Sequence, residues 1–360
     1  MKTVHVNLGE KAYPIYIHND WNQLFQEAIK SFKSDKAMII TDGHIHPLYY
    51  QEVESIVHSL GIDCSVAVVS PGEESKSFKV AEELYTAALN NGLDRNSLII
   101  ALGGGVVGDL AGFIAATYMR GIPFIQIPTS LLAQLDSSIG GKVAINHPQA
   151  KNVIGSFYQP KCVLMNISTL RTLPDRELST GMAELIKHGI IWDEDLLSWL
   201  EVNMNLLMAH DTNALEHAIH RSCEIKAYIV EQDEKEQGLR AILNFGHTVG
   251  HAIETITRFT AYTHGEAVSL GMIVEAQIAQ KLGLIDKEYV QRIKYVLTNA
   301  GLPIVMPRFD RENLISLMKH DKKNTQGRIV FVLPTAPGHV EIFKDIKKEI
   351  ILDALEDSHS

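Results

Sequence analysis

An apolar run leads directly into a glycine-rich turn at residues 97–109, SLIIALGGGVVGD. The run Ser97–Leu102 has the length and continuity of a strand that is buried on both faces of a parallel sheet. The turn has the spacing Gly103-x-Gly105-x-x-Gly108 and opens a segment with helical periodicity. Glycines at these positions let the backbone approach a diphosphate, and the N-terminus of the following helix adds donors and positive potential. The stretch therefore predicts a strand, a dinucleotide-phosphate turn and a helix.

Strand and helix patterns alternate on both sides of this stretch. A short hairpin is expected over residues 3–17, strands at 37–41 and 65–69, and helices at about 20–32, 47–60 and 78–90. After about residue 175 the strand signal fades and helical periodicity continues to about residue 300, before a short strand-like piece at 328–334. This order predicts a Rossmann-like α/β domain with a parallel sheet over residues 1–175 and a mainly α-helical domain over 176–360. Because both halves contribute motifs, we expect the site in the cleft between them.

The composition excludes several classes of partner. The chain has 360 residues, 46% of them hydrophobic and 21% charged, and a formal net charge of −10, which argues against a nucleic-acid partner. The N-terminus lacks the apolar core of a signal peptide, and no run reaches the roughly 18 apolar residues of a membrane span. Cys64, Cys162 and Cys223 are widely spaced, with no CxxC, which suits a reducing compartment. We therefore expect a cytoplasmic protein that binds neither nucleic acid nor membrane.

The glycine-rich turn differs from that of the standard dehydrogenases. Those enzymes carry an acidic residue about 20 positions later, which binds the ribose, but residues 123–128 contain none. Asp42, at the end of an earlier predicted strand, could take this role, and a turn that needs its glycines for packing alone is the alternative. The motif Pro71-Gly72-Glu73-x-x-Lys76 also follows a predicted strand, at the edge where open α/β sheets bind ligands. Taken by itself, it indicates no more than a polar loop.

Three motifs in the C-terminal half indicate a metal site. They are GMAELIK at residues 181–187, LNFGHTVGHAIE at 243–254, which lies in a long helical pattern, and HGE at 264–266. His247 and His251 are four residues apart and would share one helix face. Two imidazoles and one carboxylate suit a catalytic zinc ion with an open fourth position. The alternative is that these histidines are surface or capping residues.

Basic residues gather near these motifs in an otherwise acidic chain. They are Arg120, Lys142, Lys151, Lys187, Lys226, Arg240 and the pair Lys322-Lys323. Each of them alone would most simply be a solvated surface group. Together with a metal site, they indicate a substrate that carries phosphate or carboxylate groups.

The motifs as a set resemble the 3-dehydroquinate synthases, the sugar-phosphate cyclases of the shikimate pathway of aromatic amino acid biosynthesis. The matching motifs are PGEESK (71–76), GGGVVGDLAGFIAATYMRG (103–121), IPTSLLAQLDSSIGGKVAIN (127–146), KNVIGSFYQP (151–160), TLRTLPDRELSTGMAELIKHG (169–189), LRAILNFGHTVGHAIE (239–254) and HGEAVSLGM (264–272). They occur in the order of the family and cover the chain from about residue 40 to 335. The resemblance implies a lyase that converts 3-deoxy-D-arabino-heptulosonate 7-phosphate to 3-dehydroquinate and phosphate. The steps would be transient oxidation by NAD, phosphate elimination, reduction, ring opening and intramolecular aldol closure.

The resemblance also assigns roles to residues. Glu184, His247 and His264 would hold Zn²⁺ or Co²⁺, whereas His251 and Asn244 would transfer protons, so the simple His247–His251 pairing would not apply. The implied NAD-binding residues are Asp42, Pro71, Gly72, Glu73, Glu74, Ser75, Lys76, Gly105, Val106, Val107, Gly108, Asp109, Thr129, Ser130, Asp136, Lys142, Lys151, Thr169, Leu170, Arg171 and Thr172. The implied substrate contacts are Arg120, Asp136, Lys142, Asn152, Lys187, Lys226, Arg240, Asn244 and one of Lys322 and Lys323. Ser130, His188 and Asn166 depart from the usual Thr, Tyr and Asp, and none of these departures removes a named catalytic group. A homodimer is the expected assembly.

Three other functions compete with this interpretation. A metal-dependent NAD polyol dehydrogenase of the glycerol dehydrogenase type would share the two-domain plan, but it has no need for so many cationic residues. Cyclases that make an inosose or a valiolone are closer rivals, and Lys142, Asn152 and the region around Arg240 match the synthase at the discriminating positions. A non-enzymatic NAD- or sugar-binding module would be expected to lack a metal ligand or a proton-transfer residue, and none is missing.

Overall fold

The computed structural model describes residues 1–319 and 328–359, and these residues form two compact units. The first unit contains Met1–Leu173 and Lys226–Lys235, and the second contains Pro174–Ile225 and Glu236–Ser360. Helix α7 (Thr212–Gln232) runs from the second unit into the first, so that Lys226 belongs to the first. Among the described helices, none combines the length and the hydropathy that crossing a bilayer requires.

The first unit is built on a seven-stranded sheet with the order β1-β2-β9-β6-β5-β3-β4. The strands are β1 (Lys2–Val6), β2 (Tyr13–His18), β3 (Lys36–Asp42), β4 (Asp63–Val69), β5 (Leu98–Gly103), β6 (Phe124–Pro128) and β9 (Val163–Asn166). Only β1 and β2 pair antiparallel within this sheet. The predicted hairpin and the predicted parallel α/β sheet are confirmed. The chain changes direction across the sheet between β3 and β5, which is the switch point where such sheets bind ligands at the carboxyl ends of their strands.

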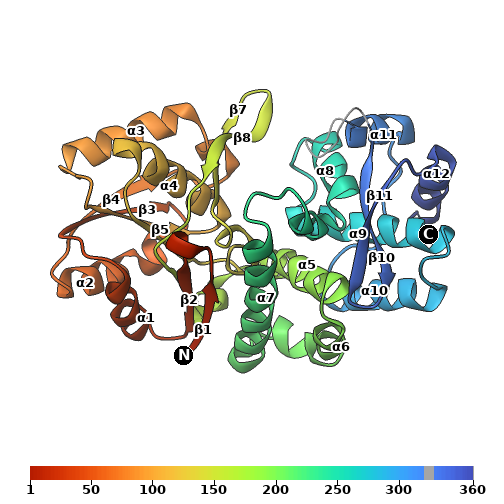
Figure 1. Cartoon of the computed structure of the whole chain (residues 1–360), viewed down its shortest axis with the longest axis horizontal. Helices are drawn as coiled ribbons and strands as arrows, with labels where there is room; N and C mark the ends of the chain where they lie inside the picture. Colours follow the sequence, from red (N-terminus) through yellow and green to blue (C-terminus); the bar gives the residue numbers. More distant parts are fainter. Residues whose placement is uncertain (320–327, 360) are drawn as a thin grey trace. The chain divides into compact units, whose positions relative to one another are not determined.

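Helices cover both faces of this sheet, which explains its continuous apolar strands. Helices α1 (Trp21–Ala28) and α2 (Gln51–Ser59) pack on one face, and α3 (Phe78–Asn90) and α4 (Gly105–Thr117) pack on the other (Figure 1). Along β3, Ala37 and Ile39 enter the first core, while Met38 and Ile40 enter the second. A strand buried on both faces needs apolar residues at every position rather than at alternate ones.

Residues 65–69 form a strand as predicted, but their apolar run does not reflect burial on both faces of the sheet. These residues belong to β4, which lies at the edge of the sheet and pairs only with β3. Val68 is 49% exposed, and the residues before it are only partly covered. An apolar run therefore predicted a strand correctly but did not reveal that the strand lies at an edge.

A separate hairpin, which the sequence patterns did not predict, extends the first unit. Strands β7 (Lys142–His147) and β8 (Ala150–Phe157) pair antiparallel, and β7 packs against α4. A Cβ atom at Gly112 of α4 would lie 2.3 Å from Val143 Cγ1, so only glycine admits this contact. The hairpin carries Lys142, Lys151 and Asn152, and it thus brings three predicted site residues onto one element.

The second unit is mainly helical, as predicted. Its helices are α5 (Asp175–Ile191), α6 (Glu194–Met208), the first part of α7, α8 (His247–Ile256), α9 (His264–Lys281), α10 (Lys287–Asn299), α11 (Arg311–Lys319) and α12 (Lys348–Asp357). Helix α9 is buried along most of its length and packs against α5, α8, α10 and α12. The strand-like piece predicted at 328–334 corresponds to β10 (Val330–Ala336), which forms a hairpin with β11 (His339–Lys344).

The long helix expected around residues 243–254 is interrupted. Leu239–Asn244 is a 3₁₀ helix, η8, and α8 begins only at His247. Gly246, between them, has a left-handed backbone with φ of 78°. Since glycine adopts this conformation at no steric cost, Gly246 allows the chain to turn sharply before His247.

Packing between α8 and α9 leaves no room for a side chain at Gly271. A Cβ atom there would lie 1.9 Å from the carbonyl oxygen of Gly246. We predict that Gly271→Ala lowers the free energy of unfolding by at least about 2 kcal/mol, because an overpacked core must shift its backbone. Urea denaturation measures this loss.

Gly43→Ala serves as the control, because the added Cβ would meet only Pro71, at 3.6 Å. We expect its free energy of unfolding to remain within about 0.5 kcal/mol of the original. Equal stability of the two variants would contradict the packing argument.

Candidate functional site

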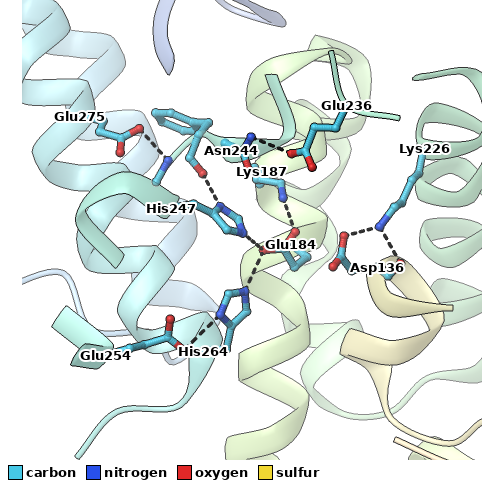
Figure 2. A network of polar contacts seen from close by, with 12 residues as sticks. Asp136, Glu184, Lys187, Lys226, Glu236, Asn244, His247, Glu254, His264 and Glu275 are labelled. Atoms are coloured by element: carbon cyan, nitrogen blue, oxygen red, sulfur yellow. Dashed lines mark hydrogen bonds and ion pairs between the residues drawn. The ribbon is translucent and has the colours of Figure 1, made fainter. Parts of the chain in front are cut away.

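Glu184, His247 and His264 converge in the second unit (Figure 2). Each offers a ligand atom, and these atoms lie within 4.8 Å of one another. Glu184 on α5 is 0% exposed, and its Oε1 lies 3.6 Å from His247 Nε2 and 3.8 Å from His264 Nε2. Both separations are too long for hydrogen bonds. Within the described residues, Glu184 Oε1 has no hydrogen-bond partner.

These separations fit three ligands of one metal ion. Ligands held at about 2.0–2.1 Å in a tetrahedral arrangement lie about 3.4 Å apart. A buried carboxylate oxygen without a hydrogen bond, facing two imidazole nitrogens, is the environment that a divalent cation would satisfy. The structure thus brings together the three residues that the resemblance implied as ligands, and their donor set fits zinc or cobalt.

The second ring nitrogen of each histidine fixes the orientation of the ring. His247 Nδ1 lies 3.1 Å from the carbonyl oxygen of Phe245, and His264 Nδ1 lies 3.3 Å from Glu254 Oε1 (Figure 2). Both acceptors favour a proton on Nδ1, which leaves the Nε2 lone pair directed toward the metal position. Glu254 was not predicted from the sequence, although it stands in the same motif as His247.

Local backbone structure places His247 at the start of α8. The Gly246 amide donates to Glu275 Oε2 at 2.7 Å, and Glu275 on α9 is fully buried. Gly271 lets α9 approach this turn closely. Sequence reasoning missed Glu275, for which the available signal was a single carboxylate in the apolar stretch MIVEAQIA at 272–279.

His264 likewise occupies the first position of a helix. Thr263 and Glu266 form a capping box at the start of α9, and Arg176 of α5 pairs with Glu266 at 2.7 Å. A Cβ atom at Gly265 would lie 2.1 Å from the carbonyl oxygen of Thr180. The motif His264-Gly265-Glu266 therefore combines a ligand, a close helix contact and a cap.

Lys187 completes the surroundings of Glu184. Its ammonium group, 1% exposed, donates to Glu184 Oε2, one helical turn away on α5. This ion pair keeps one carboxylate oxygen occupied and leaves the other facing the two imidazoles. Lys187 was expected to contact substrate, and its contact in this structure is with a ligand residue.

The two predicted proton-transfer residues lie near this cluster. The His251 ring lies 5.4 Å from that of His247 and 6.3 Å from that of His264, measured between ring centroids. Asn244 Nδ2 donates to Glu236 Oε1 at 3.0 Å (Figure 2). Glu236, in the loop before η8, is a further carboxylate that the sequence analysis did not select.

The predicted cofactor residues of the first unit gather at the carboxyl ends of its strands. Asp42 ends β3, the glycine-rich turn follows β5, and residues 71–76 follow β4. Asp42 Oδ1 accepts hydrogen bonds from the amides of His44 and Ile45, at 2.8 and 3.1 Å, which hold its side chain in place. The glycines also serve packing, because a Cβ atom at Gly108 would lie 2.6 Å from Gln126 Oε1. The packing alternative is therefore part of the explanation for this turn.

A buried ion pair links two of these segments. Lys76 is 3% exposed and donates to Asp109 Oδ2 at 2.7 Å. Burial raises the pKa of the Asp109 carboxyl to about 6, although the Lys76 ammonium acts in the opposite direction. Val106 and Val107 lie beside Asp109 in the first turns of α4.

The predicted cofactor contacts at residues 129–130 and 169–172 differ in whether their side chains already have partners within the protein. Thr129 is buried, and its Oγ1 has no hydrogen-bond partner in the part of the chain that the structure describes, so a ligand could satisfy it. By contrast, Thr169 Oγ1 donates to the carbonyl of Asn166, and Leu170 is buried in the protein. Thr172 Oγ1 hydrogen-bonds to the hydroxyl of Tyr49 and to the carbonyl of Thr169. Ser130 Oγ accepts from the amide of Ala133, and Arg171 is exposed.

The cationic residues fall into exposed and buried groups. Arg120 and Lys142 are exposed, and Lys151 is partly exposed. Lys226 and Arg240 are buried, and Lys226 forms an ion pair with Asp136 within the first unit. The Lys322-Lys323 pair lies outside the described residues.

Comparisons with known proteins show the family to which this chain belongs. Residues 66–180 match the family model described as 3-dehydroquinate synthase N-terminal, and residues 181–324 match the model described as 3-dehydroquinate synthase C-terminal. The 3-dehydroquinate synthase of Desulforamulus reducens is 49% identical over 99% of this chain and 99% of its own. The chain belongs to the 3-dehydroquinate synthase family. A second family member, from Caldanaerobacter subterraneus subsp. tengcongensis, is 48% identical over 99% of this chain and 100% of its own.

Solved structures show the same fold in other enzymes. A 2-deoxy-scyllo-inosose synthase, complexed with carbaglucose-6-phosphate, NAD⁺ and Co²⁺, has a TM-score of 0.91 and 25% identity and covers 99% of this chain and 100% of its own. A 2-epi-5-epi-valiolone synthase from Streptomyces hygroscopicus, with NAD⁺ and Zn²⁺ bound, has a TM-score of 0.88 and 24% identity over 96% of both chains. A probable glycerol dehydrogenase from Sinorhizobium meliloti has a TM-score of 0.64 and 12% identity over 96% of both chains. The likeness of the last two extends to the fold alone.

Of the two histidines of α8, His247 is among the three convergent ligand residues and His251 is not. We predict that His247→Ala loses bound metal, since its Nε2 is one of the three convergent ligand atoms. His251→Ala should retain the metal, because Glu184, His247 and His264 all remain. Metal content after gel filtration, together with the visible absorption of the Co²⁺-loaded protein, measures both outcomes. Equal metal loss in the two variants would return His251 to the ligand set.

Proposed function

We propose that this chain is a lyase that converts 3-deoxy-D-arabino-heptulosonate 7-phosphate to 3-dehydroquinate and phosphate, with NAD and Zn²⁺ or Co²⁺ as cofactors. The observation that carries the proposal is the convergence of buried Glu184 with His247 and His264, at separations that fit a metal ion. Two relatives that share 48–49% of their residues with it over nearly the whole chain bear the name of this activity. A solved cyclase with the same fold contains NAD⁺ and Co²⁺.

Glu184, His247 and His264 would hold the metal ion and leave a position open for hydroxyl groups of the substrate. A bound metal supplies Lewis acidity that favours the alkoxide form of such hydroxyls. Lys187 holds Glu184 Oε2 and offsets its charge, while Glu254 and the Phe245 carbonyl hold the Nδ1 protons of the two histidines. These partners fix the ligand atoms before substrate binds, which lowers the cost of reorganisation.

The residues at the carboxyl ends of β3, β4 and β5 would bind NAD. Asp42 would hold the ribose, and the glycine-rich turn with the start of α4 would hold the diphosphate. NAD supplies a hydride acceptor early in the reaction and a hydride donor later. In the proposed reaction the substrate would be oxidised at ring carbon C5, lose phosphate by elimination and be reduced, after which its ring would open and close again by intramolecular aldol addition.

The substrate carries a carboxylate and a phosphate at opposite ends, and the basic residues would bind both. Lys226 and Arg240 are buried rather than solvated, which distinguishes them from ordinary surface cations, and an ion pair with Asp136 holds Lys226 in place. We assign these two residues to substrate binding, together with Arg120, Lys142, Asn152 and Lys187. His251 would exchange protons through an imidazole nitrogen, and Asn244 would orient a substrate hydroxyl. Fixing both ends of the substrate positions the reacting carbons between them.

Three further assignments belong to this proposal. We divide the chain into an NAD-binding domain, 1–175, and a metal- and substrate-binding domain, 176–360, and the two compact units support this division except at Lys226–Lys235, which belong to the first unit. We place the enzyme in the cytoplasm, and its three widely spaced cysteines, with no CxxC, suit a reducing compartment. The homodimer rests on the family resemblance alone.

The proposed reaction consumes no net NAD, because the substrate is oxidised and then reduced by the same cofactor. With NAD far below the substrate concentration, released phosphate should exceed the NAD supplied many-fold. Reduced nicotinamide should show only a small transient in absorbance. One NADH accumulated per substrate consumed would indicate a dehydrogenase and overturn the proposal.

Removal of the metal should abolish phosphate release. It should leave NAD binding intact, because the predicted NAD-binding residues belong to the first unit and the metal ligands to the second. We predict that dialysis against a chelator eliminates activity, that Zn²⁺ or Co²⁺ restores it, and that NAD affinity measured by calorimetry survives the treatment. Full phosphate release by protein shown to be free of metal would contradict the assigned role of Glu184, His247 and His264.

A further inference from the structure

Asn146, near the end of β7, is not among the predicted site residues, yet it contacts three residues that are, in two segments of the chain. Its backbone amide donates to the carbonyl oxygen of Lys76 at 2.8 Å. Its side-chain Nδ2 donates to Glu73 Oε1 at 2.7 Å, and its Oδ1 accepts from the amide of Asn152 at 2.8 Å. One partly buried side chain therefore joins the cofactor loop to a predicted substrate residue.

The register of the hairpin explains why Asn146 has this position. Ile145 pairs with Ile154 and His147 pairs with Ala150, so that Asn146 alone stands opposite residues 151–153. The three opposing residues form a bulge, and bulges of this kind change the direction of a side chain. The bulge contains Lys151 and Asn152, the residues assigned to NAD and to substrate.

Asn152 is strained and is held at two points. Its backbone has a φ of 52°, in the left-handed region that non-glycine residues rarely adopt. The Asn146 side chain satisfies its amide, and the Lys76 ammonium group donates to its Oδ1. Lys76 in turn is paired with Asp109. Without Asn146, the bulge would lose the hydrogen bond that stabilises this backbone conformation.

We propose that Asn146 is a positioning residue that aligns Glu73 of the cofactor loop and Asn152 of the substrate site at the same time. It acts through Glu73 and Asn152 and does not itself contact NAD or the substrate. The proposal rests on the proposed function for the role of Asn152, whereas the role of Glu73 can be tested by NAD binding alone.

Two substitutions separate the two contacts. Asn146→Ala removes both side-chain hydrogen bonds. It should weaken NAD binding by about 5–50-fold and raise KM for the heptulosonate phosphate to a similar degree. This range corresponds to the loss of one or two hydrogen bonds to charged or strained groups. Asn146→Asp keeps an acceptor for the Asn152 amide but sets a carboxylate against Glu73. It should weaken NAD binding to at least the same degree while leaving KM for the substrate within about 3-fold of the original.

Gln149→Ala is the matched control, because Gln149 is an exposed residue in the turn of the same hairpin. It should change neither constant. Metal content of all variants should match the original protein, since Asn146 belongs to the first unit and the metal ligands belong to the second.

Calorimetry with NAD tests the first contact without turnover, and phosphate release tests the second. Unchanged NAD affinity in both Asn146 variants would overturn the proposal, as would equal increases of substrate KM in both. A wild-type protein that released no phosphate would refute the proposed function, and the NAD titrations would still decide the role of Asn146 toward Glu73.

Discussion

The burial of the Glu184 carboxylate is the constraint around which the second unit is arranged. A buried carboxylate costs several kcal/mol, as an order of magnitude, unless it is paired. Lys187 pairs with one oxygen, and the other faces two imidazole nitrogens at distances that suit a shared cation rather than hydrogen bonds (Figure 2). Helices α8 and α9 each begin at one of these histidines, and glycines allow their close approach to each other and to α5. Metal chemistry and helix packing therefore depend on the same few residues.

The first unit carries its polar site residues at the carboxyl ends of the strands of an apolar sheet. Strands β3 and β5 are largely apolar because helices cover both faces of the sheet there, and polar residues follow at the carboxyl ends of β3, β4 and β5. The glycine-rich turn serves ligand approach and helix packing together, as the contact of Gly108 with Gln126 illustrates. Lys76 then joins α4 to the β7–β8 hairpin through Asp109 and Asn152. This network links residues that are up to 76 positions apart in sequence.

The sequence predicted most elements of the sheet because a doubly covered strand leaves a continuous apolar run. It did not predict the β7–β8 hairpin, whose second strand is largely exposed and whose register is irregular. Nor could the pattern show that β4 lies at an edge, since pairing depends on the whole topology. The metal ligands were implied by a family resemblance, whereas helical spacing alone would have paired His247 with His251. Glu275, Glu254 and Asn146 escaped notice because their partners are defined by tertiary contacts, as with Gly246, which Glu275 meets across 29 positions.

The account depends most on the claim that Glu184 Oε1 faces a metal ion. Titration of the metal-free protein with Co²⁺, followed by visible absorption, tests this claim directly. The original protein should bind about one Co²⁺ per chain and show intense bands of low coordination number, as expected for three protein ligands and an open position. Glu184→Gln keeps the shape of the side chain but removes its charge, and it should lose these bands and bind at least about 10-fold more weakly. Identical spectra and affinities in the two proteins would contradict the account.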